Sequence, residues 1–205
     1  MRVPPPSSTS AVLPVQVDHH IKSLLVDGRP HPGNGFYHGG SMFNKSHGHF
    51  DNLTEFVVKV LAPSSINQGM IYRLYTYPID EQLRILDAMA SVGFSVMYEM
   101  PTAMDDCGLG YAQEMACQDM QNASRPEMVA LRKVITAVKD HPAILGYYMC
   151  DDCCKGDGGN TAYMAQGYNW IKSLDPYHIV TGATNCNDLW QWYDVAETCS
   201  PNYVP

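Results

Sequence analysis

The chain has 205 residues, of which 45% are apolar, and 13 basic against 21 acidic side chains give it a formal net charge of -8. This length and apolar content are sufficient for a buried core and exclude a disordered chain. The negative charge argues against nucleic acid and anionic membrane surfaces as partners. No run approaches the roughly 20 apolar residues of a membrane span. We therefore expect one compact domain with a neutral or cationic partner.

Cysteines and glycosylation motifs favour an oxidising, extracellular location. The Asn-X-Ser/Thr acceptors are Asn44, Asn52 and Asn122, and the disulfide candidates are Cys107, Cys117, Cys150, Cys153, Cys154, Cys186 and Cys199. Such acceptors also arise by chance, and an odd cysteine count leaves at least one thiol without an intrachain partner. The first twenty residues lack the apolar run of a secretion signal. We expect a secreted glycoprotein whose leader is not part of this sequence.

The first segment, residues 1–20, contains Pro4-Pro5-Pro6 and a Ser/Thr cluster, which predict an extended lead-in. One barrel-like domain is expected over 21–205. It starts with a hairpin that turns at Asp27-Gly28 and continues into a short strand near 35–38. Helical spacing of apolar residues predicts a helix over 50–61, and an apolar run predicts a strand over 70–75.

The same alternation continues to the end of the chain. Residues 80–93 predict an amphipathic helix ended by Gly93, and 94–98 predict a strand. A helix opens at Arg125-Pro126 and runs to 138, and the apolar strand 143–149 leads into Cys150-Asp151-Asp152. A helix over 161–174, a strand over 179–184 and a strand-like stretch over 195–203 follow.

Six strand candidates that alternate with helices predict an α/β fold with a parallel sheet, either doubly wound or closed into a (β/α) barrel. Periodicity does not choose between the two. The chain has no G-x-G-x-x-G phrase after its first strand and no Walker loop. These absences argue against a nucleotide cofactor, and we expect no cofactor.

Several phrases resemble those of retaining glycoside hydrolases with (β/α)8 barrels. They are VDGRPHPGNGFYHGG, LRILDAMASVGFSVMYEMP, VKDHPAILGYYMCDD, WIKSLDPYHIV and YDVAETCSPNYVP, from about residue 26 to the end of the chain. The resemblance implies a TIM-type (β/α) barrel, here incomplete at about six strands. It also implies an enzyme that cleaves β-linked glycans.

In these relatives the fourth strand ends in an Asp-Glu or Asn-Glu pair whose second member is the catalytic acid/base. The corresponding pair here is Asp151-Asp152, so the resemblance gives Asp152 the acid/base role, with a side chain one methylene shorter, and Asp151 the role of orienting the substrate. The nucleophilic glutamate of the relatives lies on the seventh strand, beyond the six predicted here. The usual partner carboxylate is therefore not expected in this chain, and whether the chain is active stays open.

Glycoside hydrolysis requires two carboxyl groups that flank the scissile bond. Glu99 is a second candidate, because it lies near the carboxyl end of a predicted strand, where barrel active sites are built. It would act as a base or as a stabilising charge. Strand alternation leaves another interpretation open, since a register change of one residue would turn Glu99 outward. Asp151 and Asp152 could likewise cap the next turn.

Aromatic side chains near strand ends offer flat faces for stacking on sugar rings, or else they belong to the core. The candidates for substrate binding are Tyr37, His38, Tyr98, Tyr148, Trp190 and Trp192. Of the adjacent Tyr147 and Tyr148, only one can face the barrel axis. The spacing of His38, His47 and His49 also suggests a metal site, but loop histidines more often form hydrogen bonds, and we expect no metal.

A second hypothesis has the barrel scaffold serve a non-catalytic extracellular glycoprotein that binds sugar or assembles with itself. An incomplete barrel leaves an open strand edge, and such edges pair with other chains unless they are covered. The two hypotheses differ in one requirement. An enzyme needs a second carboxylate within about 10 Å of Asp152, and a binding or structural module does not.

Overall fold

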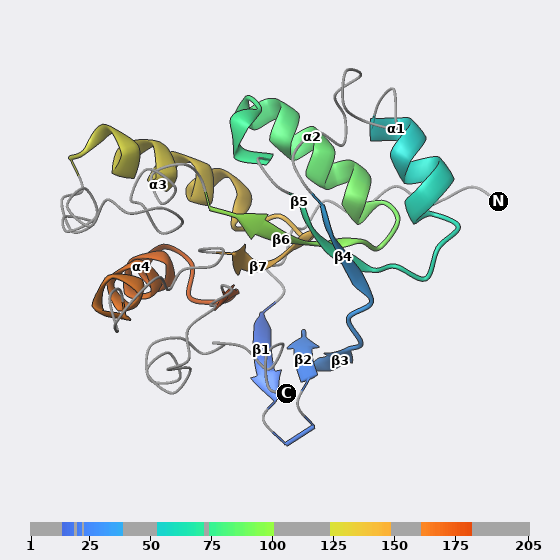
Figure 1. Cartoon of the computed structure of the whole chain (residues 1–205), viewed down its shortest axis with the longest axis horizontal. Helices are drawn as coiled ribbons and strands as arrows, with labels where there is room; N and C mark the ends of the chain where they lie inside the picture. Colours follow the sequence, from blue (N-terminus) through green and yellow to red (C-terminus); the bar gives the residue numbers. More distant parts are fainter. Residues whose placement is uncertain are drawn as a thin grey trace.

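The computed structural model describes residues 14–18, 20–21, 23–38, 53–71, 74–100, 124–148 and 161–181. These residues form two sheets and the helices that pack on one of them (Figure 1). The strands are β1 (Val15–Asp18), β2 (Ser23–Val26), β3 (Arg29–His31), β4 (Gly35–His38), β5 (Gln68–Ile71), β6 (Ser95–Glu99), β7 (Ile144–Tyr148) and β8 (Ile179–Thr181). The helices are α1 (Leu53–Phe56), the π-helical turn η1 (Val57–Leu61), the 3-10 turn η2 (Leu74–Thr76), α2 (Ile79–Ala90), α3 (Pro126–Val138) and α4 (Thr161–Leu174).

The larger sheet is parallel, and its strand order follows the chain as β4-β5-β6-β7-β8. A helix lies between each pair of successive strands. A doubly wound sheet reverses its strand order at a switch point, and the five described strands show no reversal. The topology is that of a TIM-type barrel, and these five strands do not close the barrel.

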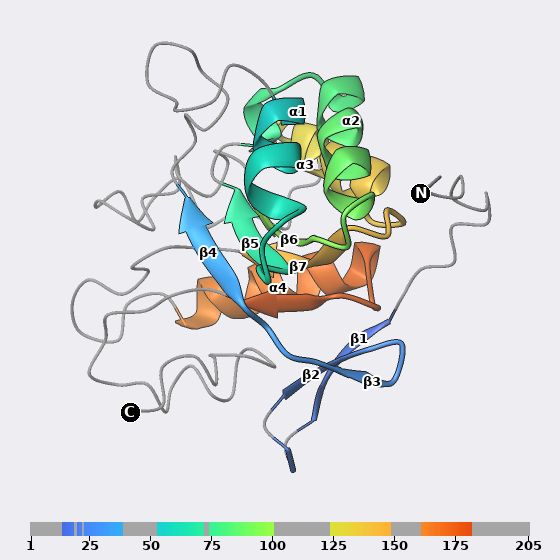
Figure 2. The same ribbon diagram turned by 90° about the vertical axis from the view of Figure 1, so that its right-hand side faces the viewer.

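The main core lies between the sheet and its helices. Figure 2 shows α1, α2 and α3 together on one side of the strands. Side chains from the sheet that point to this face include Val96, Tyr98, Ile144, Tyr147 and Val180. They pack against apolar side chains of the helices, among which Leu86, Leu131, Ile135 and Ile171 have no exposed surface. Burial of this apolar area is the main term that holds the helices on the sheet.

The smaller sheet is antiparallel, with the order β1-β2-β3, and lies on the opposite side of the parallel sheet from α1 and α2 (Figures 1 and 2). β2 and β3 form the hairpin predicted at Asp27-Gly28, where both residues have positive φ values of 51° and 70°. A type I′ turn requires positive φ at both central positions. β1 lies within the segment predicted as an extended lead-in, and it pairs with β2.

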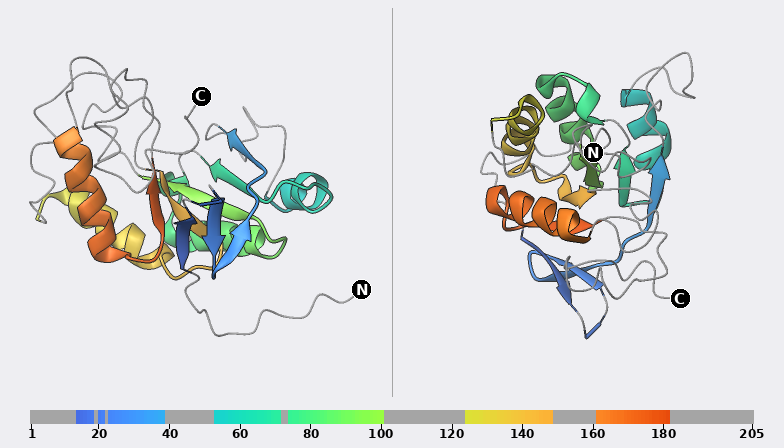
Figure 3. Two further views of the ribbon diagram at one scale, coloured as in Figure 1. Left: turned by 90° about the horizontal axis from the view of Figure 1, so that it is seen from below. Right: turned by 60° about the vertical axis from the view of Figure 1, so that its left-hand side comes forward.

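The smaller sheet covers the amino end of the barrel strands. Val15, Leu145 and Ile179 form a second apolar cluster, joined by Val17, Leu24, Val26 and Met97. The amide of Val15 donates a hydrogen bond of 2.8 Å to the carbonyl of Tyr177, just before β8 begins. The lead-in strand is thereby fixed to the start of the last described strand, and its position beside the parallel sheet is visible in Figure 3.

Most predicted elements agree with the structure, with small shifts of their ends. The helix over 161–174 has the predicted bounds, and the helices predicted over 80–93 and 125–138 are α2 and α3. The strand predicted over 70–75 is wrong at both ends, because β5 covers 68–71 and residues 74–76 form the 3-10 turn η2. The apolar and aromatic residues of this run form a turn that packs against α2, so they do not extend the strand. The stretch predicted over 195–203 lies outside the described residues.

Candidate functional site

Three residues form one row across the carboxyl ends of β6, β7 and β8. The register pairs Glu99 with Tyr148, and Tyr148 with Thr181. Each follows a residue that packs on the helix side, since Tyr98, Tyr147 and Val180 all belong to the main core. Side chains alternate between the two faces of a strand, so the row faces the barrel interior. We call it the interior row.

The interior row lies on the face that also holds Met97, Gly146 and Ile179, one layer closer to the amino end. Gly146 lets the neighbouring side chains approach closely, because a Cβ built at this position would lie 2.5 Å from Cγ1 of Ile179 and 3.2 Å from Cε of Met97. This layer is apolar, and the interior row is the next layer toward the carboxyl ends of β6, β7 and β8.

Glu99 is the acidic member of the interior row and is 7% exposed. It is the last residue of β6, and the next amide, that of Met100, continues the ladder with a bond of 2.9 Å to the carbonyl of Tyr148. This bond fixes the end of β6 against the end of β7. Burial raises the pKa of the adjacent Tyr98, and the charge of Glu99 raises it further.

On the helix side, Tyr98 anchors β6 to α2. Its hydroxyl donates a bond of 2.5 Å to Oε1 of Gln82, whose side-chain amide donates to the carbonyls of Tyr75 and Tyr77. Tyr98 has no exposed surface and Gln82 has 1%. The sequence left open whether Tyr98 binds sugar or belongs to the core. The structure places it in the core and not in the interior row.

Tyr147 anchors β7 in the corresponding position, but its partner is a carboxylate. The Tyr147 hydroxyl donates a bond of 2.6 Å to Oδ2 of Asp175, and Nδ1 of His178 lies 2.7 Å from the same oxygen. All three side chains are at most 1% exposed. Burial opposes ionisation of Asp175, but the hydrogen bonds from His178 and Tyr147 outweigh it and hold the pKa of Asp175 below its usual value.

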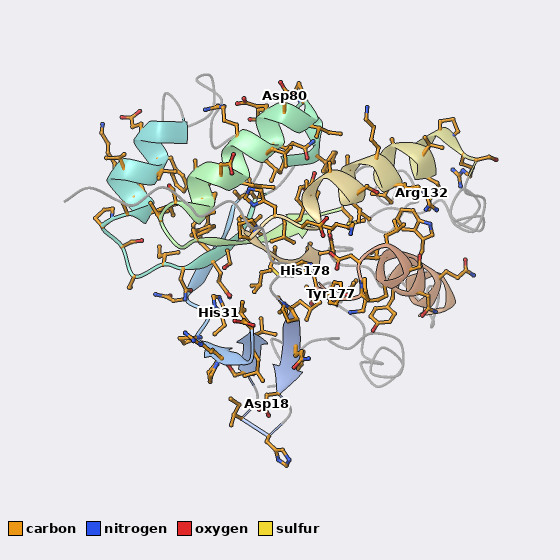
Figure 4. The ribbon with its side chains drawn as sticks, turned by 180° about the vertical axis from the view of Figure 1, so that it is seen from behind. Asp18, His31, Asp80, Arg132, Tyr177 and His178 are labelled. Atoms are coloured by element: carbon orange, nitrogen blue, oxygen red, sulfur yellow. The ribbon has the colours of Figure 1, made fainter. Side chains whose placement is uncertain are left out.

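A cavity of about 290 Å3 lies at the other end of the sheet, away from the interior row. It is lined by Pro14, Val15, Gln16, Val17, Lys172, Pro176 and Tyr177. Tyr177 and the neighbouring His178 lie where β1 meets the parallel sheet (Figure 4). Lys172 uses its ammonium group to bind two carbonyls of this turn. Because this cavity is at the amino end, it does not belong to the candidate site.

The structure brings together only part of the predicted site. Glu99 and Tyr148 are members of the interior row, whereas Tyr37 and His38 belong to β4, where the ladder pairs them with Met70 and Ile71. The remaining predicted residues lie outside the described part of the chain. They are Asp151, Asp152, Trp190, Trp192, His47, His49, the three glycosylation acceptors and all seven cysteines.

No role was assigned from the sequence to two residues, Thr181 and Asp175. Thr181 belongs to the interior row, and the sequence placed it inside the strand predicted over 179–184 without giving it a role. Asp175 was predicted only as part of an Asp-Pro turn. Within the described ranges, no group of three or more His, Cys, Asp or Glu side chains is placed to hold a metal ion. No helix in the same ranges has both the length and the hydropathy to span a membrane.

Several solved structures with similar folds are glycoside hydrolases. A GH2 β-galacturonidase from Eisenbergiella tayi matches 86% of this chain with a TM-score of 0.57 and 21% identity. A β-glucuronidase from Ruminococcus gnavus matches 90% with a TM-score of 0.59 and 16% identity. A family 5 mannosidase from Rhizomucor miehei, in complex with mannosyl-fructose, matches 91% with a TM-score of 0.59 and 12% identity. No protein-family model and no curated protein matches the sequence.

These likenesses show the fold, which is a glycosidase-like scaffold with the strand order of a TIM-type barrel. The chain spans 29% of the length of the galacturonidase, 29% of the glucuronidase and 60% of the mannosidase. The likeness therefore covers part of each neighbour. The order of strands and helices agrees with the resemblance seen in the sequence, although the identities are low.

Proposed function

We propose that this chain is a carbohydrate-active domain that binds a β-linked glycan at the carboxyl end of its parallel sheet. The observation that carries the proposal is the interior row, in which a buried carboxylate, a tyrosine and a threonine adjoin on three neighbouring strands. Active sites of TIM-type barrels are built at this end of the strands. Sugar sites combine aromatic faces with a few placed polar groups.

The proposed reaction requires two carboxyl groups, and we assign one residue to each role. Asp152 follows Tyr148 by four residues and is proposed as the proton donor, with Asp151 orienting the sugar. Glu99 pairs with Tyr148 from the neighbouring strand and is proposed as the second carboxylate, acting as a base or stabilising the positive charge of the transition state. A carboxyl group beside another carboxyl group is favoured in its protonated form, as a proton donor requires.

The test is hydrolysis of aryl β-glycosides by the wild type and by the variants Asp152→Asn and Glu99→Gln. Both variants keep the size of the side chain and remove its acid function, so each is expected to lower kcat by at least about a hundredfold. Glu81→Gln is the matched control, because Glu81 lies on the outer surface of α2 and pairs with Arg84. Variants that hydrolyse as fast as the wild type would refute the assignment.

A wild type without hydrolysis leads to a second measurement. Binding of the same glycosides is then followed by calorimetry in wild type, Glu99→Gln and Tyr148→Phe. Weaker binding by both variants supports a domain that binds sugar without turnover, which is the alternative hypothesis from the sequence. Equal binding by all three would place any sugar site elsewhere. Secretion, glycosylation, disulfide pairing and self-association remain proposals, and mass spectrometry of the protein from its source checks the first three.

A further inference from the structure

One turn, residues 175–178, lies at the amino end of the parallel sheet and receives hydrogen bonds from three different elements. Asp175 is its centre, because one carboxylate receives four donors. Oδ2 is bound by Tyr147 and His178 as described, and Oδ1 accepts from the amides of Tyr177 at 3.0 Å and His178 at 3.3 Å. The two backbone bonds form the turn, and the bond from Tyr147 connects the turn to β7.

Two further elements hold the same turn. Nζ of Lys172, in the last turn of α4, donates to the carbonyls of Pro176 at 3.1 Å and His178 at 3.0 Å. The amide of Val15 in β1 donates to the carbonyl of Tyr177 at 2.8 Å. The turn thus receives bonds from α4, β1 and β7 immediately before β8 begins. Its position fixes where β8 starts.

The neighbouring strand shows that this anchor does not require a charge. Tyr98 and Tyr147 are paired residues on β6 and β7, both without exposed surface. The hydroxyl of Tyr98 is satisfied by the neutral Gln82, whereas that of Tyr147 is satisfied by Asp175. A carboxylate is costly to bury, and such groups often add little net stability. A carboxylate accepts at two oxygens, so Asp175 binds Tyr147, His178 and the backbone of the turn at the same time, which favours a role in alignment.

We propose that Asp175 is a positioning residue, whose carboxylate aligns β8 with β7 and so sets Thr181 and Tyr148 against Glu99. The ladder pairs Tyr147 with Val180, and the next pair along the strands is Tyr148 with Thr181. A displacement of Tyr147 therefore moves the interior row directly, because Tyr148 is the next residue in β7. Insofar as the row is a sugar site, this inference rests on the proposed function.

The decisive variant is Tyr147→Phe, which removes the bond between β7 and the turn and leaves Asp175 bound to His178 and the backbone. The readout is the nuclear magnetic resonance shift of the amide and methyl groups of Thr181. We expect both to move, with a loss of kcat on the order of tenfold and little change in KM for an aryl β-glycoside. A folded Asp175→Asn variant is expected to move the Thr181 resonances further and to lower kcat more than Tyr147→Phe does.

Two control variants separate alignment from stability. Tyr98→Phe also loses one buried hydroxyl bond, on β6, and is expected to leave the shifts of Thr181 in place. Tyr177→Phe makes the same chemical change at a side chain of the turn that is 52% exposed, and both activity and shifts should match the wild type.

The result that would overturn the positioning role of Asp175 differs from the result that would overturn the proposed function. The positioning role is overturned if Tyr147→Phe leaves the Thr181 shifts unchanged, or changes them no more than Tyr98→Phe does. If the wild type neither binds nor hydrolyses glycosides, the proposed function fails. The shifts of Thr181 and Tyr148 in Tyr147→Phe still decide whether Asp175 aligns the two strands, because that measurement uses no ligand.

Discussion

The two ends of the parallel sheet differ in the side chains they hold. At the amino end, Val15, Leu145 and Ile179 are at most 5% exposed and form an apolar cluster beneath the smaller sheet. At the carboxyl end, Glu99, Tyr148 and Thr181 form a polar row. The difference indicates that the apolar cluster stabilises the fold, whereas the polar row is the place of the proposed sugar site.

The largest effect on stability is expected at the apolar cluster. Leu145→Ala removes a side chain that is 2% exposed and leaves a cavity between the two sheets, which should lower the free energy of unfolding by about 2–5 kcal/mol. Activity or binding per folded molecule should not change. Urea denaturation measures the loss, with Val58→Ala as a control at a side chain 61% exposed, where the change should stay within about 0.5 kcal/mol. Comparable losses in both variants would contradict the division between the two ends.

A smaller, pH-dependent effect is expected at Asp175, which precedes β8 at the amino end. Its pKa is lowered in the folded state, so its ionised form stabilises the fold above the unfolded pKa of about 3.9, and this contribution is lost as the pH falls through the folded pKa. Asp175→Asn should cost roughly 3 kcal/mol near neutral pH. Denaturation at several pH values should show the gap to wild type closing below about pH 3.9. A gap that stays constant into acid would show that the carboxylate charge is not the cause.

The smallest effect on stability is expected at the interior row. Glu99→Gln keeps the shape of a side chain at the polar end of β6 and should change the free energy of unfolding by less than about 1 kcal/mol, although it should impair any sugar chemistry. Thermal unfolding measured beside Leu145→Ala gives the comparison. A loss as large as that of Leu145→Ala would place Glu99 among the residues that hold the fold together.

Local signals were sufficient for several elements. The helix over 161–174 and the hairpin at Asp27-Gly28 occur where predicted, because helical spacing and a two-residue turn depend on neighbouring residues. Glu99 was expected at the end of its strand, and β6 ends at Glu99. The strand over 70–75 was wrong because the same aromatic residues suit a strand and a packed turn equally well.

Other features depend on contacts between distant segments. The ladder between β6 and β7 has a register irregularity at Val96 and Met97, and this shift sets which of Tyr147 and Tyr148 faces inward. No local pattern encodes such a shift. The pairing of β1 with β2, and the bond from Val15 to Tyr177, likewise join residues far apart in the sequence.

The sequence by itself determined the alternation of strands and helices, since apolar periodicity and turn residues act over a few positions. It also carried the resemblance to glycoside hydrolases. Only the tertiary structure decided that the strands follow chain order, that Glu99, Tyr148 and Thr181 share one face, and that Asp175 binds Tyr147. These facts depend on register and on packing between distant segments, which are fixed when the sheet assembles.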